Sequence, residues 1–282
     1  MADDPATQPS TSHRRELWLR VGIVVSAVVV LAGVVSLVLL GRSSHRAGES
    51  VAQARAQAAR VGLRSSDLSS SWGADNPATA PLSGLLGTAP STKVTALDRQ
   101  MTTKITKDYQ TCVGLNDAHD RFFGKAGVQP LAQVPSLPFS LTGSAGVVEV
   151  GTATQRYAST NDVEADQKQA ARPAFASCLS QTMGRFVLSG AGAKAIVATP
   201  GVTAQHLSAP LGVFVTGASA ELSYPSPGGA TPIEVGTTLL IAGHDEQYLY
   251  TFTSPGTFSD HERQVLIDIL GARLAAASAE SV

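Results

Sequence analysis

The chain has 282 residues, with 21 Lys and Arg against 22 Asp and Glu and a formal net charge of −1. After residue 48 the balance is 16 basic against 19 acidic residues, a net of −3 by subtraction, and no basic stripe is interleaved with aromatic residues. We therefore expect no nucleic-acid partner. Arg outnumbers Lys 15 to 6 and Ala is frequent, a composition typical of a GC-rich bacterial source.

Residues 21–40 form an uncharged apolar run, VGIVVSAVVVLAGVVSLVLL. At 1.5 Å of rise per residue, such a helix is about 30 Å long and matches the hydrocarbon core of a bilayer. A cleaved secretory signal is the alternative, but its apolar region has about 7–15 residues and ends in small residues before a cut. We expect an uncleaved transmembrane helix over residues 21–41, which follows a short disordered cytoplasmic tail over residues 1–20.

The chain has two cysteines, Cys112 and Cys178, and both follow the apolar run. Basic residues flank both ends of that run, so their count does not decide the topology. An isolated pair in an exported domain predicts one disulfide bond, because oxidising compartments keep such pairs closed. The alternative is two unrelated buried thiols in a cytosolic domain. We expect a single-pass protein of the cell membrane whose C-terminal domain is extracytoplasmic.

Residues 42–62 are expected to form a juxtamembrane stalk. The segment 48–61, GESVAQARAQAARV, has high helix propensity and a weakly apolar stripe at helical spacing. A coiled-coil dimer is the alternative to a stalk. The folded domain is expected over residues 63–277.

The first half of this domain alternates irregular and periodic segments. A loop rich in Pro, Gly, Ser and Thr follows Trp72, and a helix is predicted over residues 94–116. Strands are predicted at residues 139–142 and 147–157. The next helix has a start resembling a capping box at Asn161 and Glu164, and Pro173 should break it after Arg172. The segment after Pro173 places Cys178 on an apolar face, where Cys112 can meet it.

The last third predicts three strands and a helix. The strands are expected at residues 213–222, 233–242 and 247–253, and residues 243–246 are expected to form the turn between the last two. Ser259 and Glu262 make a capping box, and the following helix has the apolar stripe Val265, Leu266, Ile269, Leu270 and Leu274. The predicted fold class is α+β: an antiparallel sheet of about four or five strands covered by helices, preceded by one transmembrane helix.

Three aromatic residues, Tyr248, Tyr250 and Phe252, alternate along the last strand and so share one face. They are expected either to pack beneath the terminal helix or to line an apolar cleft. Tyr250, Phe252 and Trp72 are the candidate ligand-binding residues, with anchoring of the adjacent loop as the alternative role of Trp72.

A search for catalytic and metal-binding patterns finds no GxSxG, CxxC or HExxH motif. The Gly-rich segment 189–194 lacks the spacing of a phosphate-binding loop. Asp245 and Glu246 are adjacent carboxylates, but a β-turn commonly holds such residues, and His206 has no companion acid. We therefore predict no enzyme activity, no metal site and no cofactor.

Short sequence elements support a resemblance to a known family. They are Trp72 after Ser-Asp-Leu, Thr111-Cys112, Phe139-Ser140, QRYAS at 155–159 with Asp162, and Phe175-x-x-Cys178-Leu179. This order resembles the extracellular sensor domains of mycobacterial serine/threonine kinases of the PknH type and the LpqN-like lipoproteins of actinobacteria. The resemblance covers residues 63–275. The chain departs from it at residues 68–72, which read LSSSW where Leu-Pro-x-Gly-Trp is usual, and it has two cysteines where the kinase sensors have a second pair.

The resemblance implies a non-enzymatic domain with a cleft that binds or senses a component of the cell envelope, a lipid or a glycan. A structural domain that docks on another membrane protein is the alternative, and an exported hydrolase comes third. A large dry cleft favours ligand binding, whereas an exposed apolar patch favours docking.

Overall fold

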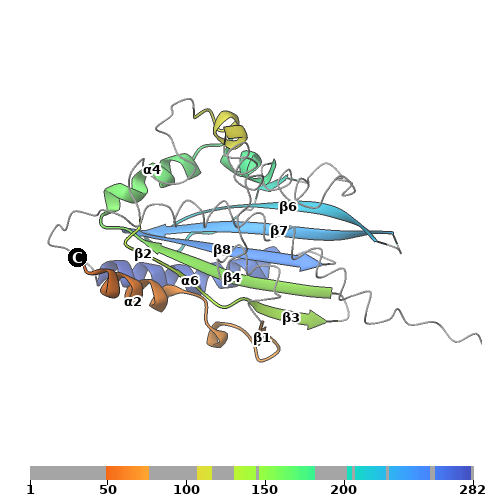
Figure 1. Cartoon of the computed structure of the whole chain (residues 1–282), viewed down its shortest axis with the longest axis horizontal. Coiled ribbons are helices and arrows are strands. Elements are labelled where there is room, and N and C mark those ends of the chain that lie inside the picture. The colour runs from red at the N-terminus through yellow and green to blue at the C-terminus, as the bar shows by residue number, and fades with distance from the viewer. Residues whose placement is uncertain are drawn as a thin grey trace, which may run out of the picture.

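One antiparallel sheet organises the molecule (Figure 1). The computed structural model describes residues 49–75, 107–115, 130–143, 146–181, 202–204, 207–226, 229–254 and 258–280. Its sheet has eight strands, with the order β1-β3-β4-β8-β7-β6-β5 and with β2 paired to β4 off this path. The predicted α+β class is confirmed, but the predicted four or five strands were too few.

The long strands occupy the centre of the sheet, and the short strands lie around them. The central strands are β4 (Gly146–Arg156), β8 (Asp245–Ser254), β7 (Gly229–Ala242) and β6 (Phe214–Ser226). The shorter strands are β1 (Gly73–Ala74), β2 (Ala132–Pro135), β3 (Phe139–Gly143) and β5 (Val202–Ala204). Sequence reasoning predicted β3 and the central strands and missed β1, β2 and β5.

Helices cover both faces of the sheet. The helices α2 (Val51–Val61) and α6 (Asp260–Ala279) contact each other, and Figure 1 shows α4 (Thr160–Ala170) lying apart from them. Residues 107–112 and 175–181 are also helical, and a short 3-10 turn, η1, spans Ser65–Asp67. The chain turns between α4 and the helix at 175–181, as Pro173 predicts.

The apolar core consists of two clusters, one on each face of the sheet, because side chains alternate between the two faces along each strand. On the face that we call the α6 face, Leu249, Leu240 and Val150 pack with Leu266, Ile267, Leu270 and Leu274. On the opposite face, the α4 face, Tyr248, Tyr250 and Phe252 pack with residues of α4 and of the two short helices. Both clusters follow from the period of two in a strand, which sends successive side chains to opposite faces.

The terminal helix begins at the predicted capping box. The Ser259 hydroxyl accepts a hydrogen bond from the Glu262 backbone N–H at 3.2 Å, and the Glu262 carboxylate reaches back to the Ser259 N–H at 3.3 Å. The predicted apolar stripe is partly wrong, because Val265 is exposed whereas Arg263 and Ile267 are buried. The buried stripe is therefore rotated from the predicted one and includes a charged residue.

The helix α2 packs directly on the sheet. Its Ala54, Ala58 and Val61 are buried, and α2 contacts β2, β4 and α6. The Gln247 side chain donates a hydrogen bond to the Val61 carbonyl at 2.8 Å. The helical part of the segment predicted to be a stalk is thus part of the folded unit, and its small Ala side chains allow the close approach.

The predicted transmembrane helix at residues 21–41 and the tail at residues 1–20 lie outside the described residues. Among the helices that the structure does describe, none combines the length and the apolar character that a membrane span needs.

The connection between β7 and β8 is shorter than predicted. Ala242 pairs with Asp245, so the turn consists of Gly243 and His244 alone. Gly243 has a φ of 58°, a conformation that glycine adopts without strain. Asp245 and Glu246 therefore belong to β8, where both are buried, and their assignment to a turn was wrong.

Candidate functional site

The predicted disulfide is present and ties two segments together on the α4 face. Cys112 and Cys178 are bonded, with their Cα atoms 5.7 Å apart. Beside the bond, the Tyr109 and Phe175 rings meet edge to face at 6.3 Å, and the Arg172 guanidinium donates to the Val113 carbonyl at 2.9 Å. The disulfide therefore lies in a packed corner that holds residues 107–115 against residues 175–181.

The aromatic stripe of β8 lies beneath these segments and α4. Tyr248 and Tyr250 stack with ring centroids 6.1 Å apart, and Phe252 is 1% exposed. The interpretation that the stripe packs beneath the terminal helix is wrong, because that helix covers the other face, where Leu249 points. The stripe is part of the core of the α4 face among the described residues.

At the start of β8 the same face carries a buried acidic group. Glu246 is 0% exposed, and its Oε2 accepts a hydrogen bond from the Tyr248 hydroxyl at 3.0 Å. The Asp166 carboxyl of α4 and the hydroxyl of Tyr157, the residue that follows β4, lie beside this carboxyl and act on its pKa. Asp166 is likewise 0% exposed. Two carboxyl groups and two phenols thus meet where α4 lies on the sheet, and we call this set the acid–tyrosine cluster.

Burial dominates the electrostatics of the acid–tyrosine cluster. Burial, and then the neighbouring Asp166 carboxyl, raise the pKa of Glu246 well above its usual range, although the hydrogen bond from Tyr248 lowers it. Burial, and then the neighbouring Glu246 carboxyl, also raise the pKa of both tyrosines. The phenols therefore stay neutral, and the cluster holds protons rather than releasing them.

Trp72 lies elsewhere. It is partly buried and packs against the apolar cluster of the α6 face, just before β1. Tyr250 and Phe252 belong to the cluster of the α4 face. The structure therefore brings Tyr250 and Phe252 together but not Trp72, so the three candidate residues do not form one site. Their roles in ligand binding stay predictions.

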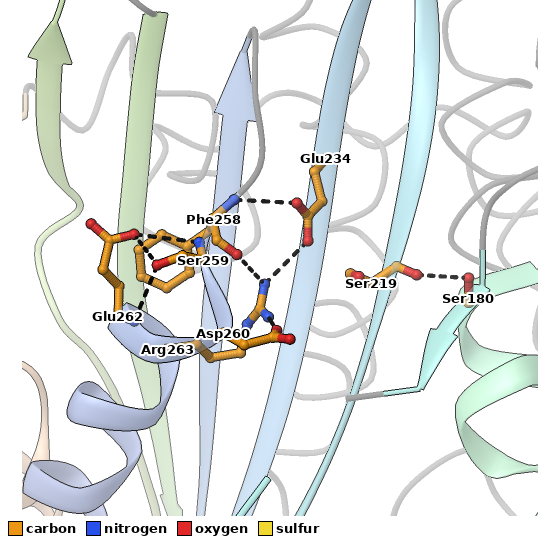
Figure 2. A network of polar contacts seen from close by, with 8 residues as sticks. All are labelled: Ser180, Ser219, Glu234, Phe258, Ser259, Asp260, Glu262 and Arg263. Atoms are coloured by element: carbon orange, nitrogen blue, oxygen red, sulfur yellow. Dashed lines mark hydrogen bonds and ion pairs between the residues drawn. The ribbon is translucent and has the colours of Figure 1, made fainter. Parts of the chain in front are cut away.

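The α6 face carries a contrasting network around Arg263 (Figure 2). The Arg263 guanidinium contacts the Glu234 carboxylate at 3.1 Å and the Asp260 carboxylate at 2.8 Å, and it lies 5.4 Å from the centre of the Phe258 ring. Glu234 also accepts from the Phe258 N–H at 3.2 Å. Gly236 lies beside this network, and a Cβ there would collide with the Thr251 hydroxyl. These contacts fix the first turn of α6 on β7.

A second ion-pair network lies at the end of the sheet where the described chain begins. The Arg156 guanidinium contacts the Asp245 carboxylate at 2.6 Å and the Glu49 carboxylate at 2.7 Å. Next to it, His244 Nδ1 lies 2.7 Å from the Tyr157 carbonyl oxygen, and the Tyr157 N–H donates to the His244 carbonyl at 2.9 Å. Residue 49 is thereby fixed to the ends of β4 and β8.

The adjacent carboxylates Asp245 and Glu246 are both buried. Asp245 is 1% exposed and Glu246 is 0% exposed, so neither carboxylate is in contact with solvent. The residues that the structure describes contain no cluster of His, Cys, Asp or Glu able to hold a metal ion. His206 and the Gly-rich segment 189–194 lie outside those residues.

Sequence reasoning missed the acid–tyrosine cluster. It recognised Glu246 but placed it in a turn, and it did not single out Asp166. One signal was available in the sequence. Glu246 lies two residues before Tyr248, so in a strand its side chain is on the same face as Tyr248, Tyr250 and Phe252. Charged groups are seldom buried without a partner, so an acid on this buried face predicts a polar residue on the helix that covers it.

No protein-family model, curated protein or solved structure matches this chain.

Proposed function

We propose that the chain is a membrane-anchored extracytoplasmic domain that binds or senses a component of the cell envelope without catalysing a reaction. The observation that carries the proposal is the disulfide between Cys112 and Cys178. Such bonds persist in oxidising compartments and are rare in the cytosol. The disulfide therefore supports an extracytoplasmic location for the α+β unit.

The position of Glu49 supports a short tether. The apolar run ends at residue 40, so eight residues, 41–48, separate it from Glu49. Eight extended residues span at most about 28 Å. If residues 21–41 cross the membrane, the sheet end that carries Glu49, Arg156 and the Gly243–His244 turn lies close to the bilayer. The opposite end, with the β6–β7 connection, would then face the envelope.

The resemblance to kinase sensor domains and LpqN-like lipoproteins supports the sensing role. Those domains are non-enzymatic, and the buried state of Asp245 and Glu246 agrees with a chain that does no acid–base chemistry on a substrate. A lipid, a glycan or a neighbouring membrane protein is the proposed partner. Tyr250 and Phe252 are the proposed apolar contacts, reached only if the covering segments move away from the α4 face.

A reporter fusion tests the location. A phosphatase that is active only outside the cytoplasm, fused after Val282, should show activity in cells. A cytosolic reporter at the same position should be inactive. The reverse pattern would overturn the proposed membrane topology, and with it the oxidising compartment in which the disulfide is expected to persist.

Native mass spectrometry of the full-length protein, released gently from membranes, tests ligand binding. A co-purified lipid or glycan should appear as a discrete mass increment. The increment should disappear in Tyr250→Ala, whereas the surface variant Glu164→Gln should keep it. A protein mass without any increment in every preparation would contradict the binding proposal and leave the topology result unaffected.

A further inference from the structure

The way in which α4 is attached to the sheet differs from the attachment of α2 and α6. α4 buries Val163, Asp166, Gln169 and Ala170, so half of its buried residues are polar. Before α4, the Tyr157 N–H is bonded to the His244 carbonyl, and after it the Cys178 disulfide fixes the chain. α4 thus lies between two fixed points, and its middle contacts β8 through Asp166.

The hydrogen bonds at Glu246 are incomplete in a particular way. Oε2 accepts from the Tyr248 hydroxyl, whereas Oε1 is buried and has no hydrogen-bond donor in the described structure. The Tyr157 hydroxyl donates to the Gln155 side chain at 2.8 Å, so its proton is already in use. A buried acceptor without a donor destabilises the fold, because the desolvation of that oxygen is not compensated. A proton on Oε1 removes that destabilisation, because the acid then donates to Asp166.

We propose that Glu246 is a protonated carboxylic acid whose shared proton latches α4 onto the sheet, and that losing this proton releases α4. With the proton, the acid donates to the Asp166 carboxylate across the contact between β8 and α4. Without it, two negative charges face each other in the core. Each buried charge then lacks solvation, and their repulsion separates α4 from β8. The release uncovers the part of the aromatic stripe that lies beneath α4, which the proposed binding function needs, so this part of the inference rests on that function.

The groups around the latch agree with a single titrating proton. They are Tyr248 on β8, Tyr157 after β4, Asp162 and Asp166 on α4, Tyr109 on the short helix and Arg172 after α4. The phenols stay neutral because burial raises the pKa of each one. Arg172 donates to the Val113 carbonyl, and its charge lowers the pKa of Tyr109.

The sign of the pH dependence follows from the raised pKa of Glu246. A group with a folded-state pKa above its unfolded value stabilises the fold fully below the unfolded pKa. That contribution is lost as the pH rises through the folded pKa. The latch is therefore closed in acid and opens in base, the opposite of a carboxylate held in an ion pair.

Hydrogen exchange of the full-length protein tests the latch. Exchange of residues 160–170 is measured by mass spectrometry from about pH 5 to about pH 9 and divided by the intrinsic rate at each pH. In the wild type, protection should fall about tenfold per pH unit above the pKa of Glu246, as expected for one proton. Glu246→Gln, which keeps the shape and a donor, should show no such fall. Glu164→Gln, on the exposed side of the same helix, should behave as the wild type does.

Two results would overturn the latch: protection of residues 160–170 that is flat with pH in the wild type, or a fall of equal size in Glu246→Gln. If Glu246→Gln does not fold, infrared spectroscopy of the wild type replaces it. The carbonyl stretch of a protonated carboxyl should disappear at the pH at which protection falls, and its absence at acidic pH would equally contradict the proposal. If protection depends on pH as expected but no envelope component is found bound, the latch is supported and only its connection to ligand binding is contradicted.

Discussion

The two faces of the sheet neutralise buried acids by different means. On the α6 face, Glu234 pairs with Arg263 and Asp245 pairs with Arg156. On the α4 face, Glu246 contacts hydroxyl groups and a second carboxyl. An arginine keeps its charge at every accessible pH, so the ion pairs of the α6 face persist as the pH rises. A shared proton is lost in base, so the attachment of α4 depends on pH. We infer that the α6 face supplies the scaffold and the α4 face the movable part.

Removal of the Arg263 guanidinium should have the largest effect on the α6 face. Arg263→Ala leaves Glu234 buried without a cation, and breaking a buried pair in this way costs about 3–5 kcal/mol. Denaturant unfolding of the full chain in detergent measures the loss.

Asp260 provides the matched control for that variant, because its side chain is 71% exposed although it also contacts Arg263. Asp260→Asn should cost less than about 1 kcal/mol, the usual value of an exposed pair. Equal losses for the two variants would show that burial of Glu234 is not what makes Arg263 important. The contrast between the two faces would then lose its physical basis.

The aromatic stripe tests whether the α4 face is only core. Phe252→Ala should lower the free energy of unfolding by about 3–5 kcal/mol, as large-to-small core changes do. Tyr250→Ala should cost less, because Tyr250 is 7% exposed whereas Phe252 is 1% exposed. Both variants should be compared for stability and for retention of any co-purified ligand. Binding lost in strict proportion to stability would assign the stripe to packing alone.

The disulfide is expected to stabilise the α4 face alone. Cys112→Ser or Cys178→Ser opens a loop with a sequence separation of 66, and the expected loss is about 2–5 kcal/mol. Hydrogen exchange should rise first in residues 107–115 and 175–181, while α6 keeps its protection. An unchanged denaturation midpoint under oxidising conditions would mean that the bond adds nothing to the fold.

Features set by near neighbours in the chain were predictable from sequence. The capping box at Ser259, the break at Pro173 and the central strands depend on local residue types, and they are confirmed. The paired cysteines are a longer-range case that composition still revealed. Contacts between distant parts of the chain were harder to predict. The burial of Arg263 was missed because a charged residue interrupts the apolar stripe of the helix. Only the fold shows that Glu234 faces Arg263.

The remaining errors have similar physical causes. β1, β2 and β5 are short strands, with two, four and three residues, and they owe their pairing to the long strands beside them rather than to their own propensity. Asp245 and Glu246 have the composition of a turn, but the two-residue turn before them leaves both in β8. To predict the acid–tyrosine cluster, one must know which side chains of β8 share a face and where α4 lies on the sheet. The position of α4 depends on tertiary packing and cannot be derived from local sequence.

The helix caps give the smallest expected effect and the finest comparison of the two faces. At α6, the Ser259 hydroxyl accepts from the Glu262 N–H, so Ser259→Ala should cost about 1 kcal/mol. At α4, the equivalent Ser159 makes no side-chain cap hydrogen bond, so Ser159→Ala should change stability by less than about 0.5 kcal/mol. Thermal unfolding of the two variants at one pH measures the difference. A helix without a side-chain cap receives no stabilisation from one at its first turn, which agrees with an α4 that can be released. A cost at Ser159 equal to that at Ser259 would show that α4 is capped in solution and would argue against its release.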